Sequence, residues 1–108
     1  MIARVWSAQT KPAQAPAYAR HLREQVLPAI RKVPGYAGAK LLERALAGAV
    51  EIVVITFWES AEAVQRFAGA DLAEAVVAEE AAALLTQFDR RVRHFEVIVE
   101  EGKGDPGP

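Results

Sequence analysis

Two short segments at opposite ends of the chain carry the side chains best suited to catalysis. Side chains alternate along a strand, which places Arg4 and Trp6 on one face of the first segment. The same alternation places His94 and Glu96 on one face of the last. If the segments are neighbouring strands, His94 can act as a general base, Arg4 can stabilise an anion and Trp6 can form a stacking wall. The alternative is an Arg4–Glu96 cross-strand ion pair beside a structural histidine.

Three further residues are candidates for contact with a substrate. Trp58 ends a strongly apolar segment, where its ring can line a cavity or fill the core. Phe67 belongs to a helical apolar stripe and is expected in the core, within reach of any pocket. Glu80 interrupts a run of apolar residues spaced by four from position 72 to position 88. A carboxylate on such a stripe must be paired, protonated or facing a cavity, unless the helix bends there and turns it outward.

The residue types limit the cofactors that the chain can hold. The two histidines, His21 and His94, are far apart and cysteine is absent, so a catalytic zinc site has little from which to be built. No dinucleotide-binding glycine motif, Walker-type loop or Gly-Xaa-Ser-Xaa-Gly elbow occurs. We therefore expect no metal and no cofactor. His21 directly precedes Leu22 on a predicted helix, and we expect it at the helix boundary or in solvent.

Length and composition indicate one globular domain. The chain has 108 residues, of which 52% are hydrophobic and 25% charged, a balance far from that of disordered chains. A net charge of −1 with interspersed signs leaves no basic patch for nucleic acid or a membrane surface. The amino terminus lacks the pattern of a leader sequence, and no apolar run is long enough to span a bilayer. We expect a cytoplasmic protein without disulfides.

The site residues must be positioned by six elements in a regular order. The spacing of apolar residues and turn signals predicts strands over 2–9, 39–46, 50–58 and 92–100, and helices over 15–33, 60–67 and 71–88. Pro28 should kink the first helix or end its regular part early. Because 60–67 and 71–88 together form the second helical region, the order is βαββαβ. This order predicts an α+β, ferredoxin-like domain over residues 1–100 with a four-stranded antiparallel sheet, followed by a disordered tail over 101–108.

One strand indicates that a second subunit is needed. Residues 50–58 are apolar on both faces, which is typical of a strand covered on both sides. Helices on one face of the sheet leave the other face open. We therefore expect a homodimer through the sheet faces, in which two sheets face each other across a two-fold axis and form a barrel.

Five sequence motifs together resemble the antibiotic biosynthesis monooxygenase family. They are MIARVW at 1–6, VPGYAG at 33–38, FWES at 57–60, FAG at 67–69 and HFEV at 94–97. The resemblance covers nearly all of residues 1–97 and implies a dimeric α+β barrel with a pocket in each subunit between sheet and helices. Some relatives oxidise polycyclic aromatic substrates with molecular oxygen and no cofactor or metal, and others degrade haem. Similar proteins tend to carry a Tyr-Tyr-Pro-Glu-Asp-like run where this chain has VAEEA at 77–81, and only Glu80 matches it in register.

These observations lead to three hypotheses about function. The first is a cofactor-independent monooxygenase acting on a small aromatic or hydrophobic substrate. The alternative is a non-catalytic dimeric module that binds a small hydrophobic ligand or a partner protein. The third, haem binding and degradation, is disfavoured because residues 60–88 contain no histidine, whereas similar haem-degrading proteins carry the axial ligand on the helix after the third strand.

Overall fold

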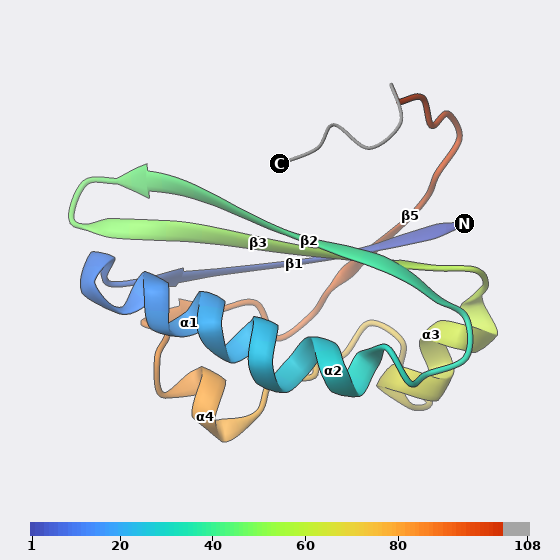
Figure 1. Ribbon diagram of the computed structural model, residues 1–108, viewed down its shortest axis with the longest axis horizontal. Helices are drawn as coiled ribbons and strands as arrows, with labels where there is room; N and C mark the ends of the chain where they lie inside the picture. Colours follow the sequence, from blue (N-terminus) through green and yellow to red (C-terminus); the bar gives the residue numbers. More distant parts are fainter. Residues whose placement is uncertain (103–108) are drawn as a thin grey trace.

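The structure, a computed structural model, describes residues 1–102 and contains one antiparallel sheet with all its helices on one side (Figure 1). The strands are β1 (Ile2–Thr10), β2 (Tyr36–Leu46), β3 (Ala49–Trp58), β4 (Gln87–Phe88) and β5 (Arg93–Glu96). Their order is β2-β3-β1-β4, and β5 also pairs with β1. The α+β, ferredoxin-like prediction is confirmed, while most of the tail predicted at 101–108 lies outside the described residues.

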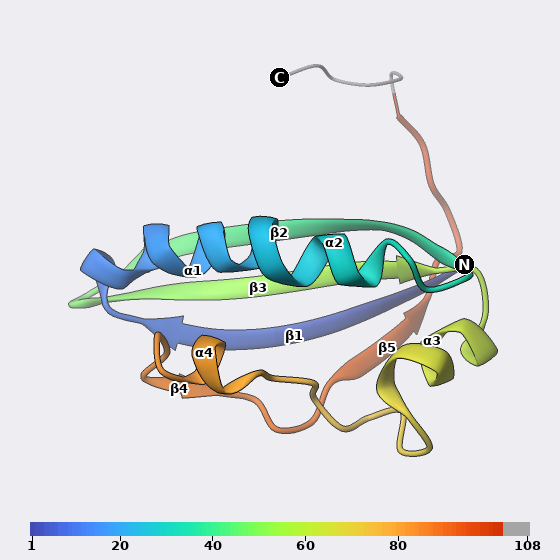
Figure 2. The ribbon, with the colours of Figure 1, turned by 60° about the horizontal axis from the view of Figure 1, so that its bottom comes forward.

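Strand β1 is the centre of the sheet. Along one side it pairs with β3 over its whole length. Along the other side, β5 pairs with the first half of β1 and β4 with its end. The predicted fourth strand over 92–100 is therefore shorter than expected, and two short strands share its place beside β1 (Figure 2).

The first helix is one rod with an irregular middle. It comprises α1 (Ala15–His21), a π-helical turn (Leu22–Val26) and α2 (Leu27–Ile30). Pro28 has no N–H for the carbonyl four residues earlier, and its ring crowds that carbonyl. The wide turn directly before Pro28 relieves this conflict, which confirms the predicted interruption. Tyr18 and Leu22 pack from the rod onto β3.

Strand β3 is apolar on both faces, as predicted. Its side chains toward the helices are buried, and Ile52 and Trp58 are completely inaccessible. Its side chains on the opposite face, among them Val53, Ile55 and Phe57, are only half-buried. The helices thus complete the core on one face and leave apolar surface on the other.

The segment after β3 follows the prediction only in part. Helix α3 (Ala61–Ala68) begins at Ser60, whose hydroxyl accepts from the N–H of Ala63 at 3.2 Å, and ends at Gly69 with φ +87°. The predicted helix over 71–88 is wrong, because only α4 (Glu79–Ala82) forms there.

Tertiary hydrogen bonds explain this difference. The N–H of Ala75 donates to the carbonyl of Arg90 at 2.9 Å, and the N–H of Val92 donates to the carbonyl of Ala73 at 2.7 Å. Thr10 donates through its hydroxyl to the carbonyl of Leu84 at 2.5 Å. Helix propensities differ by only about 0.7 kcal/mol per ordinary residue, so these bonds outweigh the preference of an alanine-rich segment.

The turn before β2 provides a stability test. Gly35 has φ +94°, and a Cβ placed there would collide with the Cβ of Ala63. Gly48, in the β2–β3 hairpin, has φ +72° and open space around it. We expect Gly35→Ala to lower the free energy of unfolding by about 3 kcal/mol and Gly48→Ala by about 1 kcal/mol, because only the first adds overpacking to backbone strain. Urea denaturation measures both, and equal losses would contradict the assignment of a close approach at Gly35.

Candidate functional site

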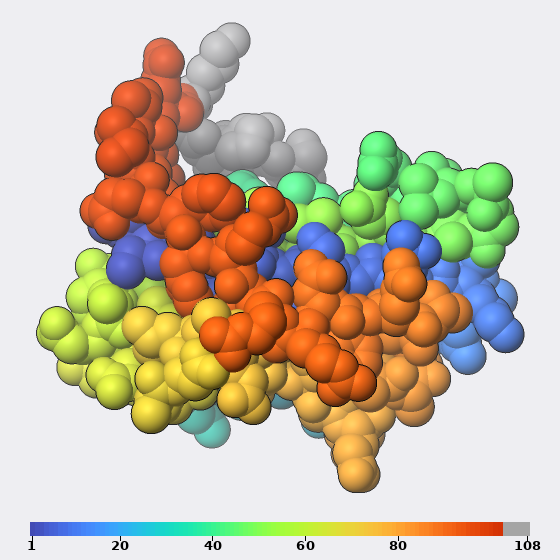
Figure 3. Space-filling model, turned by 180° about the vertical axis from the view of Figure 1, so that it is seen from behind, coloured from blue at the N-terminus to red at the C-terminus, as the bar shows by residue number. Residues whose placement is uncertain are grey.

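A cavity of about 80 Å³ lies between the helical rod and the sheet. It is bounded by β1, β3, the rod, the end of α3 and the connection between α3 and α4, here called the 69–78 connection. The lining residues are mostly apolar: Arg4, Trp6, Tyr18, His21, Leu22, Val26, Ile30, Val54, Thr56, Phe67, Val76, Val77, Ala78, Ala81 and Val92. Figure 3 shows, from the outside, the orange and red chain around β4 and β5 packed between β1 and the yellow part of the 69–78 connection.

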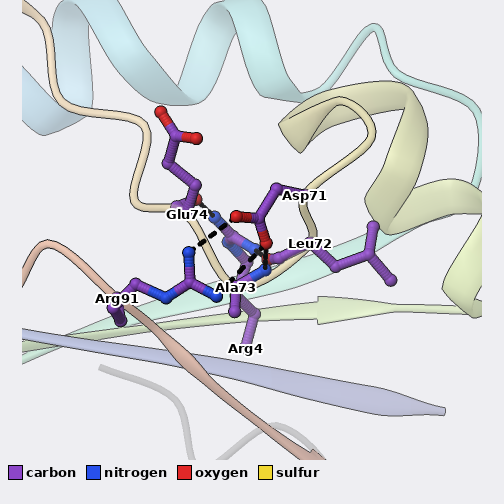
Figure 4. A network of polar contacts seen from close by, with 6 residues as sticks. All are labelled: Arg4, Asp71, Leu72, Ala73, Glu74 and Arg91. Carbon is purple, nitrogen blue, oxygen red and sulfur yellow. Dashed lines mark hydrogen bonds and ion pairs between the residues drawn. The ribbon is translucent and has the colours of Figure 1, made fainter.

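Arg4 is the charged residue of this lining, and it is 5% exposed. Its guanidinium donates from Nη1 to the carbonyl of Leu72 at 2.5 Å and from Nη2 to the carbonyl of Glu74 at 2.8 Å (Figure 4). It also lies over the ring of Phe67, 5.5 Å from the centroid. No carboxylate within residues 1–102 forms an ion pair with it. Burial lowers the pKa of Arg4, as expected for a cation removed from water.

His94 lies behind Arg4 and does not line the cavity. The two residues are paired across β1 and β5, with His94 Nε2 3.0 Å from Arg4 Nη1. A guanidinium can only donate, so this imidazole nitrogen accepts and the proton sits on Nδ1. The lone pair of this nitrogen is therefore engaged by Arg4 and is not free to take a proton from a ligand in the cavity. The alternative Arg4–Glu96 ion pair is not formed, and Glu96 instead approaches the terminal amine of Met1 at 4.0 Å.

The predicted aromatic residues divide between the cavity and the core. Trp6 and Phe67 line the cavity. Trp6 is held by a bond from its Nε1 to the carbonyl of Asp89 at 2.8 Å. Trp58 does not reach the cavity, because it is completely buried beneath Phe67, with ring centroids 5.3 Å apart. Its Nε1 donates to the hydroxyl of Thr56 at 2.8 Å, so it supports the wall rather than forming it.

Glu80 also lies away from the cavity. It is exposed on α4, while its neighbour Ala81 is buried and contributes to the lining. The apolar stripe that placed Glu80 inward assumed a continuous helix over 71–88. The short α4 has a different orientation, so the carboxylate faces outward.

His21 on α1 was not predicted to line a cavity, but it does so together with Tyr18. Tyr18 is 4% exposed, and burial raises the pKa of its hydroxyl to about 12. His21 lines the cavity with its ring centroid 6.4 Å from that of Tyr18. Residues three apart on a helix share a face, so the position of His21 relative to buried Tyr18 was the available signal.

The fold and the cavity define a class: a small α+β protein with a mostly apolar pocket between its sheet and its helices. The model of the antibiotic biosynthesis monooxygenase family matches residues 1–79. The chain therefore belongs to this family, a monooxygenase-like family.

Solved structures agree with the family. A putative antibiotic biosynthesis monooxygenase from Bacillus cereus is 19% identical with a TM-score of 0.64, over 94% of this chain and 96% of that one. The heme-degrader MhuD from Mycobacterium tuberculosis, with two hemes in its active site, is 26% identical with a TM-score of 0.62, over 94% and 100%. A Streptomyces coelicolor monooxygenase in complex with nanaomycin D is 21% identical with a TM-score of 0.58, over 93% and 92%. No curated protein matches.

Neither a metal-binding cluster nor a membrane-spanning helix occurs within residues 1–102. No group of three or more histidine, cysteine, aspartate or glutamate side chains within this range is arranged to hold a metal ion. Over the same range, every helix is too short or too polar to span a bilayer.

The environment of His94 predicts how stability depends on pH. Burial, and secondarily the charge of Arg4, hold the pKa of His94 below its ordinary value of 6.5. As the pH falls through about 6.5, the unfolded chain takes up a proton that the native state does not, so stability falls. We expect urea denaturation to give a lower free energy of unfolding at about pH 5.5 than at about pH 7.5.

The His94→Gln variant should reduce this pH dependence, because it removes the titrating group. The matched control is Asp71→Asn. Hydrogen bonding to Arg91 holds the pKa of Asp71 below 3.8, outside this window, so the control should retain the wild-type slope. A wild-type slope in His94→Gln would contradict the assigned environment.

Proposed function

We propose that this protein is a cofactor-independent monooxygenase acting on a small aromatic substrate that carries an ionisable hydroxyl group. The observation that carries the proposal is Arg4, a buried cation without a carboxylate partner at the wall of an apolar, aromatic cavity. Burying one ion away from water costs on the order of several kcal/mol of free energy. An anionic ligand compensates this cost, so the site favours a substrate that is, or becomes, negatively charged.

The hydrogen bonds of Arg4 leave it able to bind such an anion. A guanidinium has about five N–H donors in a fixed geometry. Two of them go to the carbonyls of Leu72 and Glu74 and one to His94. The remaining donors are available for an oxyanion, and the ring of Phe67 can stack against an aromatic substrate beside it.

The proposed reaction balances with molecular oxygen as the co-substrate. The hydroxyl loses its proton, and the electron-rich ring carbon of the resulting anion gives an electron pair to oxygen, which is reduced. One oxygen atom stays on the ring as a carbonyl. The other leaves as water with two hydrogen atoms, one from the hydroxyl and one from the ring carbon, so a phenol becomes a quinone.

The cavity must enlarge for this substrate. Its volume of about 80 Å³ is below the roughly 150 Å³ of an engineered cavity that binds benzene. The 69–78 connection is the part of the wall without helix or strand, and Arg4 holds it through the carbonyls of Leu72 and Glu74. In this proposal the cavity enlarges by displacement of this connection, while the anion binds the donors of Arg4 that Leu72, Glu74 and His94 do not use.

The residues of this site do not fit haem. A haem iron needs an accessible axial ligand. Residues 60–88 contain no histidine, and the Nε2 of His94 is engaged by Arg4 outside the cavity. The histidine that lines the cavity, His21, comes from α1 and not from the helix after the third strand. A cavity of about 80 Å³ would also have to enlarge far more for haem than for a small aromatic substrate. The heme chemistry of MhuD is therefore not carried over to this chain.

The protein acts as a homodimer in this proposal. The sheet face away from the helices is apolar, with half-buried Val53, Ile55 and Phe57 on β3. Leu42 on β2 is 46% exposed and Phe95 on β5 is 49% exposed. An apolar sheet face of this kind in a small protein fits a second copy of itself across a two-fold axis.

Oxygen uptake tests the proposed activity. With a panel of naphthols and anthracenols, without added metal, we expect wild-type protein to consume oxygen and form quinones. Arg4→Met should lower kcat/KM by about 100-fold, the usual effect of removing an oxyanion-stabilising donor. The matched control is Arg66→Met, since Arg66 is exposed and its side chain donates to the carbonyl of Pro34, away from the cavity.

Three outcomes contradict the proposed activity. The first is equal kcat/KM in Arg4→Met and wild-type protein. The second is purification with stoichiometric haem, seen as a Soret band. The third is absence of oxygen uptake with ligand binding retained, which favours the non-catalytic module.

Light scattering after size-exclusion chromatography tests the dimer. Val53→Lys places a charge in the middle of the open sheet face, so we expect it to weaken dimerisation by at least about 100-fold, or roughly 2.7 kcal/mol. Ala29→Lys on the exposed side of α2 is the matched control and should remain dimeric. A monomeric wild-type protein, or a dimeric Val53→Lys variant, would contradict the proposed dimer through the sheet faces.

A further inference from the structure

One polar atom in the cavity has no partner. The Nε2 atom of His21 is buried, and no group among residues 1–102 forms a hydrogen bond with it. Among residues 1–102, no other buried side-chain nitrogen or oxygen lacks a hydrogen-bond partner. A buried polar group without a partner is destabilising and uncommon in native structures, where it calls for an explanation.

The other titratable residues of the cavity cannot accept a proton at neutral pH. Arg4 remains a cation and can only donate. Tyr18 is a neutral phenol there, because burial raises its pKa to about 12. No other lining residue on β1, β3, α3, α4 or the 69–78 connection is titratable. His21 is thus the one lining side chain with a free lone pair suited to taking up a proton.

The backbone around His21 also departs from regular helix. His21 is the last residue of α1, and the π-helical turn (Leu22–Val26) begins directly after it. This turn accommodates Pro28, and π-helical turns are also frequent at functional sites. Tyr18 and Leu22, which flank His21 on the same side of the rod, are both buried, so the imidazole is held between the rod and the cavity.

We propose that His21 is the catalytic base that removes the hydroxyl proton of the substrate, with Arg4 binding the anion so formed. The O–H bond of the substrate breaks, its electron pair stays on oxygen, and a new N–H bond forms at Nε2 of His21. This step is redox-neutral and leaves an imidazolium and an oxyanion. The inference deepens the proposed function, on which it rests for the reaction that follows. His94 has a separate role, since it positions Arg4.

The first test compares substrates that differ in acidity. His21→Gln should lower kcat/KM by about 100-fold or more for a phenol with an ordinary pKa of about 10, the usual contribution of general base catalysis. For a nitro-substituted phenol that is already ionised, the loss should be under about fivefold, because no proton needs to be removed. His94→Gln is the control and should affect both substrates alike. Equal losses for both substrates in His21→Gln would overturn the proposal.

A second test does not depend on turnover. In 4-nitrophenol, the phenol and the phenolate absorb at different wavelengths, so binding to wild-type protein should show phenolate at a pH where the free compound is protonated. Calorimetry in two buffers of different ionisation enthalpy should detect no net proton release, since His21 takes the proton up. In His21→Gln, the bound compound should stay protonated or release its proton to the buffer.

The two proposals fail in different ways. If the protein consumes no oxygen but ionises bound 4-nitrophenol in a His21-dependent way, the oxygenase proposal fails and the role of His21 as a base stands. Ionisation that is unchanged in His21→Gln, or no binding of 4-nitrophenol to wild-type protein, overturns the role of His21. His21→Phe guards against misfolding: it removes the unpartnered polar group, so its thermal midpoint should equal or exceed that of wild-type protein.

Discussion

The buried guanidinium of Arg4 is the interaction on which the rest of the site depends. It joins the central strand β1 to the 69–78 connection through the carbonyls of Leu72 and Glu74, and to β5 through His94. These partners are neutral, so the charge is solvated by dipoles but not cancelled. The arrangement stabilises the cavity wall and leaves the cavity with an unbalanced positive charge.

The alternation of side chains along β1 places the cavity and the open apolar surface on opposite faces of the sheet. Arg4 and Trp6 face the helices and build the cavity, while Val5 and Ser7 belong to the opposite face. A change of register by one residue would exchange these faces, and full-length pairing with β3 prevents it. The cavity can therefore lie close to the apolar face without sharing residues with it.

In the proposed mechanism, the chemistry is divided between a strand and a helix. Arg4 on β1 suits the binding of an anion, and His21 on α1 suits the creation of one. A buried cation and an unpartnered imidazole nitrogen both lower the stability of the native state. Their presence in one small cavity fits the general finding that functional sites retain groups that a purely structural core would replace.

The sequence by itself determined the order of the elements, the irregularity at Pro28 and the shared strand face of Arg4 and Trp6, because each follows from local periodicity, backbone chemistry or strand parity. Only the tertiary structure decided the rest. The alanine-rich 71–88 segment is mostly non-helical, since distant groups bind its backbone, and this turns Glu80 outward. Trp58 lies behind Phe67, and His21 faces the cavity, because burial depends on packing between elements that are distant in the chain, which local patterns do not contain.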